Sequence, residues 1–517
     1  MNEVDLPGLQ VALAGQTQPS ATATTSGRAR VKPIDRSQTS WRAVDVEALI
    51  EQDHPARAIW DLTGRLPLEN FYAPIQAVDG TAGRMPWDPR LLISLWLYAY
   101  SRGISSAREV ARRCQFDPAF QWLCGLETVN HHTLSDFRVT HQSELEELFV
   151  QLLAVLSAEG LVSLERVMHD GTKIRSDASR KSFRGEEALG EHLQTAREQV
   201  AALSGEQNHD ECCRQHAAQE RAARERQERV EKALQQLEQI RERKSGAEEK
   251  KQARVSTSDP EARIMKQPGG GYAPSYNVQL STEASHKIIV GVAITQDGND
   301  YAQLTPAVKQ IKENLDSAPK QMVVDGGFTS RENIVNMAAQ GIDLVGSLPD
   351  AAGQSSASIS RGSHTAQFSG EAFAYNAEQN LYRCPAGEVL KAGRQRKLNG
   401  ATQHIYQAPA QACQRCPFKA QCCPRSQRRM LARLEEGAEI EAFRQKMQTP
   451  EARQLYKQRA EVAEFPNAWI KEKLALRRFR VRGLVKVKCE TLWAALTYNI
   501  QQWIRLCWLP KLEPVAS

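Results

Sequence analysis

The stretch LERVMHDGT, residues 164–172, joins an apolar run to an acid and a glycine. Val167 and Met168 belong to a run with the composition of a short strand, and Asp170 ends it. Gly171 would let the backbone turn close to a ligand, after which residues 172–174 would resume as a hairpin partner. An Asp-Gly pair is also a common surface turn, so this stretch alone leaves two interpretations open, a site acid or an ordinary turn.

The same pattern returns in QMVVDGGFT, residues 321–329, where an apolar run again ends in an acid, Asp325, followed by glycine. Two aspartates at strand ends provide the hard oxygen ligands, held on rigid strands, that a divalent cation needs. Such a site calls for a third carboxylate. Glu464 offers it, within the stretch YKQRAEVAEFPNAWIK at residues 456–471.

Several motifs together resemble the DDE transposases of bacterial insertion sequences, most closely the IS eleven-eighty-two group. The resemblance covers nearly everything from about Trp87 to Arg505. It departs from the usual tyrosine, arginine, glutamate, lysine signature in one place, because four residues instead of three separate Arg459 from Glu464. The six residues between Glu464 and Lys471 match, which favours Glu464 over Glu461 as the third acid. The matching stretches are MHDGTKI (168–174), DPEARIMK (259–266), YNVQL (276–280), VVDGGF (323–328), AEFPNAWIK (463–471), RGLVKVKCE (482–490) and Tyr498-Asn499.

This resemblance implies an α/β fold with a ribonuclease-H-like mixed sheet flanked by helices, and an enzyme that cuts and rejoins the ends of its own element. Asp170, Asp325 and Glu464 would hold two Mg²⁺ (or Mn²⁺) ions for an in-line displacement. Lys471 and Arg459 would hold phosphates of the DNA end, and the family's signature tyrosine, Tyr456 here, would contact the nucleic acid. The partners implied are double-stranded DNA, as inverted-repeat ends and target, and further copies of the chain on that DNA.

Length and composition are those of an ordinary multidomain protein. The chain has 517 residues, 41% of them hydrophobic and 25% charged, with a net charge of +6. The run Leu91–Tyr100 is too short to span a bilayer, and the first thirty residues lack a basic start followed by an apolar core, so we expect a cytoplasmic protein without membrane contact. The resemblance implies in addition that the protein is bacterial and nucleoid-associated. Eleven scattered cysteines indicate reduced thiols or a metal site. The modest net charge means that DNA binding must be argued from local patches.

Composition shifts divide the chain into five parts. We expect a disordered segment (1–40), a helical DNA-binding module (41–161), the first part of the catalytic core (162–349) with a charged helical insertion (180–257), a cysteine-rich insertion (350–433), and a C-terminal helical part of the core (434–517) that carries the third acid.

Two short helices are expected within the helical module, the first capped by a serine at 105 or 106 and the second by Thr133 or Ser135. Such helices suit a helix-turn-helix DNA reader, and they suit a plain helical bundle with solvated arginines equally well. The arginines at stake are Arg108, Arg112, Arg113 and Arg138.

The core is expected to contain strands at residues 277–280, 287–295 and 344–348 and a helix at 304–314. Asp297 and Asp300 fall in the loop after a strand and are interpreted as turn residues.

The cysteine-rich insertion carries a Cys-x-x-Cys pair, Cys413 and Cys416, with Cys422 six residues further on. Cys384 could complete four thiolates, which predicts a structural Zn²⁺ site in a lobe with few large apolar residues. Single Cys-x-x-Cys pairs also occur without metal, so the alternative is a set of free thiols. Cys423 is then the spare cysteine.

Residues 471–488 contain eight basic residues and one acidic residue, a density typical of contact with a phosphate backbone. A solvated helix face is the alternative interpretation. The arginines that we expect to contact DNA there are Arg477, Arg478, Arg480 and Arg482.

Two other functions stay open beside transposition. A DNA-binding regulator would keep the basic surfaces without the chemistry, and a metal-dependent nuclease would cut DNA without strand transfer.

Overall fold

The computed structural model describes residues 36–37, 39, 43–76, 85–205, 213–347, 366–398, 401–435 and 437–512. The chain divides into two compact units, Met1–Asp45 and Val46–Ser517. The disordered segment predicted for residues 1–40 falls almost entirely outside the described residues. Every element below belongs to the second unit. None of its described helices combines the length and the apolar content needed to cross a bilayer.

Short helices make up the part before the sheet, as the apolar spacing predicts. Ser106 caps one of them by accepting a hydrogen bond from the Glu109 amide. The prediction of Thr133 or Ser135 as the next cap was wrong, because the extended residue Asn130 accepts from the His132 amide one turn earlier. The elements are η1 (Glu47–Leu49), α1 (Pro55–Thr63), α2 (Glu69–Tyr72), α3 (Pro89–Ser101), α4 (Ala107–Arg113), α5 (Pro118–Cys124), α6 (His131–Thr140) and α7 (Gln142–Ala158).

A mixed sheet of six strands follows, with the order β4-β5-β1-β7-β8 and with β6 also paired to β5. Strand β5 is antiparallel to β1, β4 and β6, whereas β1, β7 and β8 run parallel to one another. The predicted mixed α/β architecture is therefore confirmed. The strands are β1 (Arg166–Arg175), β4 (Arg263–Lys266), β5 (Tyr272–Glu283), β6 (Ile289–Thr295), β7 (Gln321–Val324) and β8 (Asp343–Val345).

Strand β1 does not turn at Gly171, which corrects the predicted hairpin. The strand runs without a break from Arg166 to Arg175 and pairs with β5 along this length. Gly171 lies opposite Gln279 in that ladder. Antiparallel pairing on β5 thus outweighs the local turn preference of the Asp-Gly pair.

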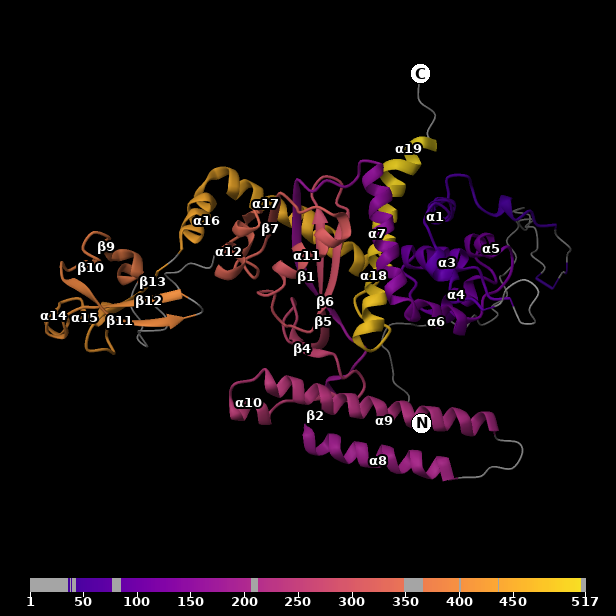
Figure 1. Ribbon diagram of the computed structural model, residues 1–517, viewed down its shortest axis with the longest axis horizontal. Helices are drawn as coiled ribbons and strands as arrows, with labels where there is room; N and C mark the ends of the chain where they lie inside the picture. Colours follow the sequence, from indigo (N-terminus) through magenta and orange to yellow (C-terminus); the bar gives the residue numbers. More distant parts are fainter. Residues whose placement is uncertain are drawn as a thin grey trace, which may run out of the picture. The chain divides into compact units, whose positions relative to one another are not determined.

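Helices cover both faces of this sheet (Figure 1). Val462 and Ala463 of α17 pack against Met168, Val323 and Val345 on one face. On the other face lie α11 and α12, and α18 packs beside α7. The helices are α11 (Leu304–Leu315), α12 (Arg331–Ala339), α16 (Ala438–Gln448), α17 (Pro450–Glu472), α18 (Leu484–Trp503), the π-turn η5 (Ile504–Trp508) and α19 (Leu509–Leu512).

Helix α18 is fixed to the sheet by the Tyr498-Asn499 motif. The buried Asn499 amide pairs with both the N–H and the C=O of Ile289, at 2.9 and 2.8 Å. Tyr498 donates to the Lys287 carbonyl at 2.9 Å. At the other end of α18, Asp259 accepts from the Gly483 amide and Glu261 from the Leu484 amide. These motif residues therefore serve the fold.

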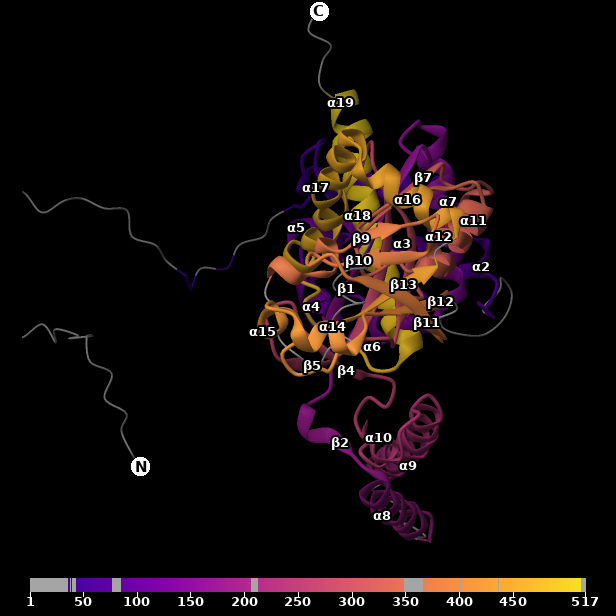
Figure 2. The same cartoon turned by 90° about the vertical axis from the view of Figure 1, so that its left-hand side faces the viewer.

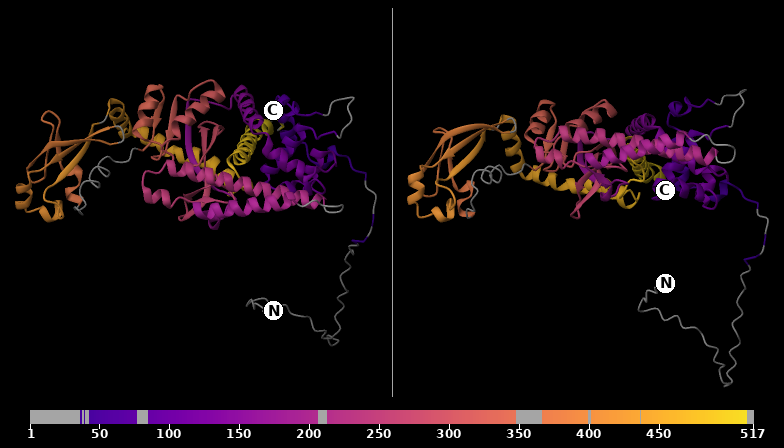
Figure 3. Two further views of the ribbon diagram at one scale, coloured as in Figure 1. Left: turned by 60° about the horizontal axis from the view of Figure 1, so that its bottom comes forward. Right: turned by 90° about the horizontal axis from the view of Figure 1, so that it is seen from below.

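The charged insertion forms a helical hairpin, as predicted. Helices α8 and α9 lie side by side (Figures 2 and 3), with Leu189, Ala233 and Leu237 buried between them and the adjoining strand. Arg241 pairs with Glu186, and Arg197 with Glu231, which fixes an antiparallel arrangement. The elements are η2 (Arg180–Ser182), β2 (Phe183–Arg184), α8 (Glu186–Gly205), α9 (Cys213–Glu242), α10 (Ala247–Lys251) and β3 (Val255–Ser256).

The cysteine-rich part contains a five-stranded antiparallel sheet that the sequence analysis did not predict. Phe373, Leu390, Tyr406 and Leu431 form its apolar cluster, so this part has a core of its own. The elements are η3 (Ala366–Phe368), η4 (Gly370–Ala372), β9 (Ala374–Asn376), β10 (Leu381–Arg383), β11 (Val389–Leu398), β12 (Ala401–Gln407), α14 (Ala410–Arg415), α15 (Lys419–Cys422) and β13 (Met430–Glu435).

Candidate active site

Asp170 and Asp325 lie next to each other on the parallel strands β1 and β7. The last paired residues are His169 and Val324, so the two aspartates follow as neighbours in the same register. Side chains alternate along a strand, and Asp170 therefore shares the face of Met168 and Asp325 that of Val323. This is the face on which α17 packs.

Helix α17 presents polar side chains to β1 at regular spacing. The Asn467 amide donates to a carboxylate oxygen of Asp170 at 2.9 Å, and one turn later Lys471 donates to the Thr172 hydroxyl. Thr172 lies two residues after Asp170, on the same face of the strand. The helix and the strand thus run alongside each other, with Lys471 two turns beyond Glu464 as predicted.

Arg459 lies between Asp170 and Glu464. Its guanidinium nitrogens are 3.8 Å from a carboxylate oxygen of each acid, and only 16% of its side chain is exposed. The Glu464 side chain is 62% exposed and is linked to Asp170 through this arginine. Glu461 instead forms an ion pair with Lys287 at 3.1 Å. Of the two glutamates, Glu464 is therefore the one connected to Asp170, through Arg459.

The electrostatic environment opposes charge on Asp170. The pKa of Asp170 is raised to about 6, chiefly by burial and also by the charges of Asp325 and Asp300, while Arg459 acts in the opposite direction. Burial also lowers the pKa of Lys471. A cation placed among these acids would relieve their mutual repulsion.

A fourth acid, Asp300, approaches from the opposite face of β1. Its carboxylate accepts hydrogen bonds from Asn277 and Gln279, each at 2.7 Å. A Cβ on Gly171 would lie 2.5 Å from an Asp300 oxygen, so only glycine leaves room for this carboxylate. From the sequence, Asp300 was interpreted as a turn residue. The one feature of the sequence that could have indicated its place is the glycine at 171, whose missing side chain leaves room for it.

The carboxylates of Asp170 and Asp325 suit a hard divalent cation, because such cations prefer oxygen ligands. The strands that carry the two residues hold these ligands rigidly. Among the residues that the structure describes, no three His, Cys, Asp or Glu side chains are grouped closely enough to hold one ion together. Glu464 is the acid that stands apart. In this arrangement it meets Asp170 only through Arg459.

Three of the four arginines after α17 form ion pairs with acidic side chains. Arg477 pairs with Glu472, while Arg478 and Arg482 each pair with Asp177 at 2.9 Å. The Arg480 side chain is exposed. Tyr456, the remaining residue expected to contact DNA, packs beside the apolar cluster under α17 with Arg459 near its ring.

The arginines of the helical module divide into two groups. Arg112 and Arg113 pair with Glu109 on their own helix. Arg138 is buried, donates to the Ser105 carbonyl, and lies 3.9 Å from the fully buried Glu490. Arg138 is therefore a structural residue, since DNA could not reach it without unpacking the module.

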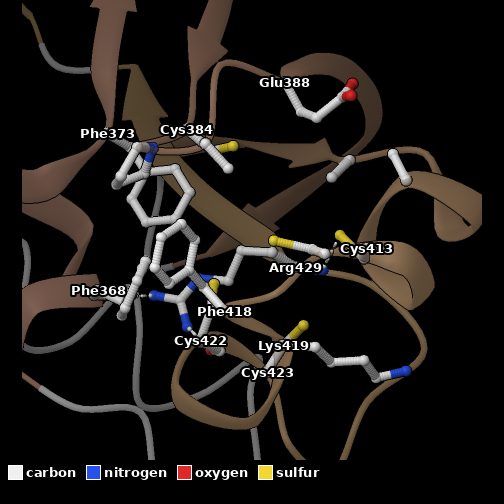
Figure 4. Close-up of a pocket in the computed structure, with 15 residues that line it drawn as sticks. Phe368, Phe373, Cys384, Glu388, Cys413, Phe418, Lys419, Cys422, Cys423 and Arg429 are labelled. Carbon is white, nitrogen blue, oxygen red and sulfur yellow. Dashed lines mark hydrogen bonds between the residues drawn. The ribbon is translucent and has the colours of Figure 1, made fainter.

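The cysteines of the insertion line one small cavity of about 30 Å³, including Cys416 and the presumed spare, Cys423. Figure 4 shows Cys384, Cys413, Cys422 and Cys423 around it, beside Phe373 and Arg429. Burial, together with the charges of Cys423, Cys413 and Cys384, raises the pKa of Cys422 to about 12. Burial also raises the pKa of the Cys423 thiol, which lines the same cavity and so belongs to the cluster.

Comparison with known proteins identifies the class. Residues 383–504 match the family model of a transposase DDE domain, and residues 44–140 match a transposase domain, DUF772. The chain therefore carries a transposase DDE domain and a second transposase domain, which confirms the resemblance to DDE transposases seen in its motifs. The DDE match includes Arg459, Glu464 and Lys471, whereas Asp170 and Asp325 lie outside it.

The comparison with curated proteins found no match. Among solved structures, the chain is similar to the piggyBac transposase in a synaptic complex with hairpin DNA. The identity is 10%, the TM-score is 0.33, and the similarity covers 90% of this chain and 76% of that one. A TM-score this low does not establish a common fold.

Proposed function

We propose that this transposase cuts and rejoins DNA at the ends of its own element, with Asp170, Asp325 and Glu464 as the catalytic acids. The observation that carries the proposal is the adjacency of Asp170 and Asp325 on parallel strands, under a helix that bears Glu464. The strand order and directions, β6-β5-β1-β7-β8 with the first pairs antiparallel and the last parallel, support a ribonuclease-H-like core.

The three acids would hold divalent cations, with Mg²⁺ or Mn²⁺ as candidates, and bound cations would lower the pKa of an attacking water and stabilise charge on the phosphate. The chain's own residues then have distinct tasks. Asn467 orients the Asp170 carboxylate by a direct hydrogen bond. Arg459 compensates the charges of Asp170 and Glu464 when no cation is present. Lys471, held by Thr172, offers its ammonium group to a phosphate near the acids.

The remaining assignments complete the proposal. The element belongs to the IS eleven-eighty-two group, and the predicted parts are the domains of the enzyme, with the helical module at residues 41–161 binding the inverted-repeat ends. The enzyme acts on double-stranded DNA as a homo-oligomer. Arg477, Arg478, Arg480 and Arg482 contribute phosphate contacts, for which Arg477, Arg478 and Arg482 exchange their acidic partners.

One assay separates this function from the alternatives. Purified protein is incubated with labelled element ends and target DNA in Mg²⁺. A transposase shifts the ends in a gel, cleaves them and joins them to the target. Shifting alone would support a regulator, and cleavage without joining would support a nuclease; either result contradicts the proposal.

We also propose that the cysteines of the insertion bind a structural Zn²⁺ ion. Thiolates are the preferred ligands of structural Zn²⁺, and Cys384, Cys413, Cys416 and Cys422 line one cavity, in which their sulfurs would have to draw closer together to hold an ion. Metal analysis of protein purified without chelator should then give about one Zn per chain. Less than a tenth of that in folded protein would exclude the site.

A further inference from the structure

A basic groove lies beyond the acids along β1, with a cavity volume of about 540 Å³. None of the residues that line it is acidic. Three of its cations, Lys173, Arg175 and Arg180, were not singled out in the sequence analysis. The lining also includes the turn between β4 and β5, where Gly269 and Gly270 add no side chains. Its other basic residues are Lys471, Arg477 and Arg478.

Backbone pairing builds this groove. The end of β1 pairs with the segment after α17, since Arg175 bridges to Arg478 and its carbonyl accepts from the Phe479 amide at 2.9 Å. On its other side the Ser176 amide donates to the Pro274 carbonyl of β5. Cations from two separate segments, residues 173–180 and 471–478, are thus held together by main-chain hydrogen bonds, and the groove does not depend on flexible side chains alone.

Two features indicate that the groove takes an anion. Within the described residues, the side chains of Lys173, Arg175 and Arg180 have no hydrogen bond or ion pair, in contrast with Arg477 and Arg478. The Ser176 hydroxyl lines the groove, is 2% exposed, and has no hydrogen-bond partner. Burying a hydroxyl without a hydrogen-bond partner costs about 1–3 kcal/mol of stability. A bound phosphate oxygen would offset this cost by accepting a hydrogen bond from the hydroxyl.

We propose that this groove binds the phosphodiester backbone of a DNA strand that leads away from the acids, a proposal that rests on the proposed function. Lys471 joins the two places, because it lines the groove and contacts Thr172 beside Asp170. Arg175 is five positions after Asp170, about 17 Å at ~3.4 Å per strand residue. One DNA strand rises about 3.4 Å per nucleotide, so Arg175 meets a phosphate about five nucleotides from the reacting one.

The test neutralises the three free cations together, as Lys173→Gln, Arg175→Gln and Arg180→Gln in one variant. Binding to labelled element ends is measured from about 50 to about 300 mM salt, a range over which phosphate contacts dominate the salt dependence. The slope of log K against log salt should become shallower by about 0.9 for each phosphate that the variant no longer neutralises, or by about 2.7 for three phosphates. A matched control, Lys309→Gln with Lys312→Gln and Lys320→Gln, removes three cations away from the groove and should leave the slope unchanged.

Neutral methylphosphonates placed singly along each strand then locate the phosphate that the groove binds. Wild-type binding should weaken when the substitution lies about five nucleotides from the cleavage site, given a rise of about 3.4 Å per nucleotide, and the triple variant should be insensitive there. Ser176→Ala should weaken binding at the same position. Thermal unfolding of each variant verifies that it is folded.

The outcomes distinguish a failure of the groove proposal from a failure of the proposed function. If wild type neither binds nor cleaves the ends, the proposed function is wrong. If wild type cleaves, and a folded triple variant keeps its salt slope and its methylphosphonate pattern, the groove proposal alone is wrong.

Discussion

Asp170 lies beside Asp325 because β1 and β7 pair in parallel up to His169 and Val324. The adjacency brings two carboxylates together that are far apart in the sequence, and their mutual repulsion contributes to the raised pKa of Asp170. Such an arrangement is unfavourable for the fold alone. It is useful if the acids share a cation.

Replacing Asn467 by Ala should slow cleavage and leave DNA affinity unchanged. The variant loses the 2.9 Å hydrogen bond that orients the Asp170 carboxylate. Hydrogen bonds to charged groups contribute about 1.5–3 kcal/mol, which corresponds to a rate about 10- to 100-fold lower. Single-turnover cleavage and gel-shift titration give the two quantities. Gln458→Ala, an exposed position on the same helix, is the control and should cleave normally.

Replacing Gly171 by Ala should destabilise the core. The new methyl carbon would lie 2.5 Å from an Asp300 oxygen and 2.6 Å from the Gln279 amide, and overpacking of this kind costs about 1–3 kcal/mol. Chemical unfolding measures the loss. Adding Asp300→Ala should recover part of it in a double-mutant cycle, because the obstructing carboxylate is gone. Additive losses would mean that Asp300 does not press on this position. Gly298→Ala has open space and serves as the control.

Replacing Arg138 by Ala should weaken the packing of the helical module on α18 without affecting DNA recognition directly. Removing one partner of a buried ion pair costs about 3–5 kcal/mol. Arg138 also supports Trp96, with its guanidinium 5.0 Å from the ring. We expect a lower free energy of unfolding, and unchanged DNA affinity for the fraction that is still folded. Loss of affinity in fully folded protein would instead make Arg138 a DNA contact.

Elements with a regular pattern of apolar residues could be predicted from the sequence. The helices before residue 161, the helical insertion and the mixed sheet follow from periodicity, because burial of one face imposes that pattern. The order of the strands and the pairing of β1 with β7 depend on contacts over long sequence distances, which no local pattern encodes. The repeated acid-glycine pattern supplied Asp170 and Asp325 as candidates and the signature spacing favoured Glu464, but only the fold could relate the three in space.

The errors have local explanations. At Asp170-Gly171 the turn preference of the dipeptide was outweighed by pairing with β5. Arg138 was grouped with the exposed arginines because sequence spacing does not distinguish a buried cation from a solvated one. Asp300 was missed because its partners, Asn277 and Gln279, lie on another strand. The sheet of the cysteine-rich part was missed because the polar, glycine-rich start of this region masked its short strands.

Cleavage by single-acid variants tests the central claim most directly. Asp170→Ala, Asp325→Ala and Glu464→Ala are compared with wild type for binding and for Mg²⁺-dependent cleavage of labelled ends, with Glu461→Ala as the control from the same helix. We predict that the first three bind the ends nearly as well as wild type and do not cleave, because the acids serve the chemical step, and that Glu461→Ala cleaves normally. Cleavage at the wild-type rate by any of the first three would contradict the account for that residue.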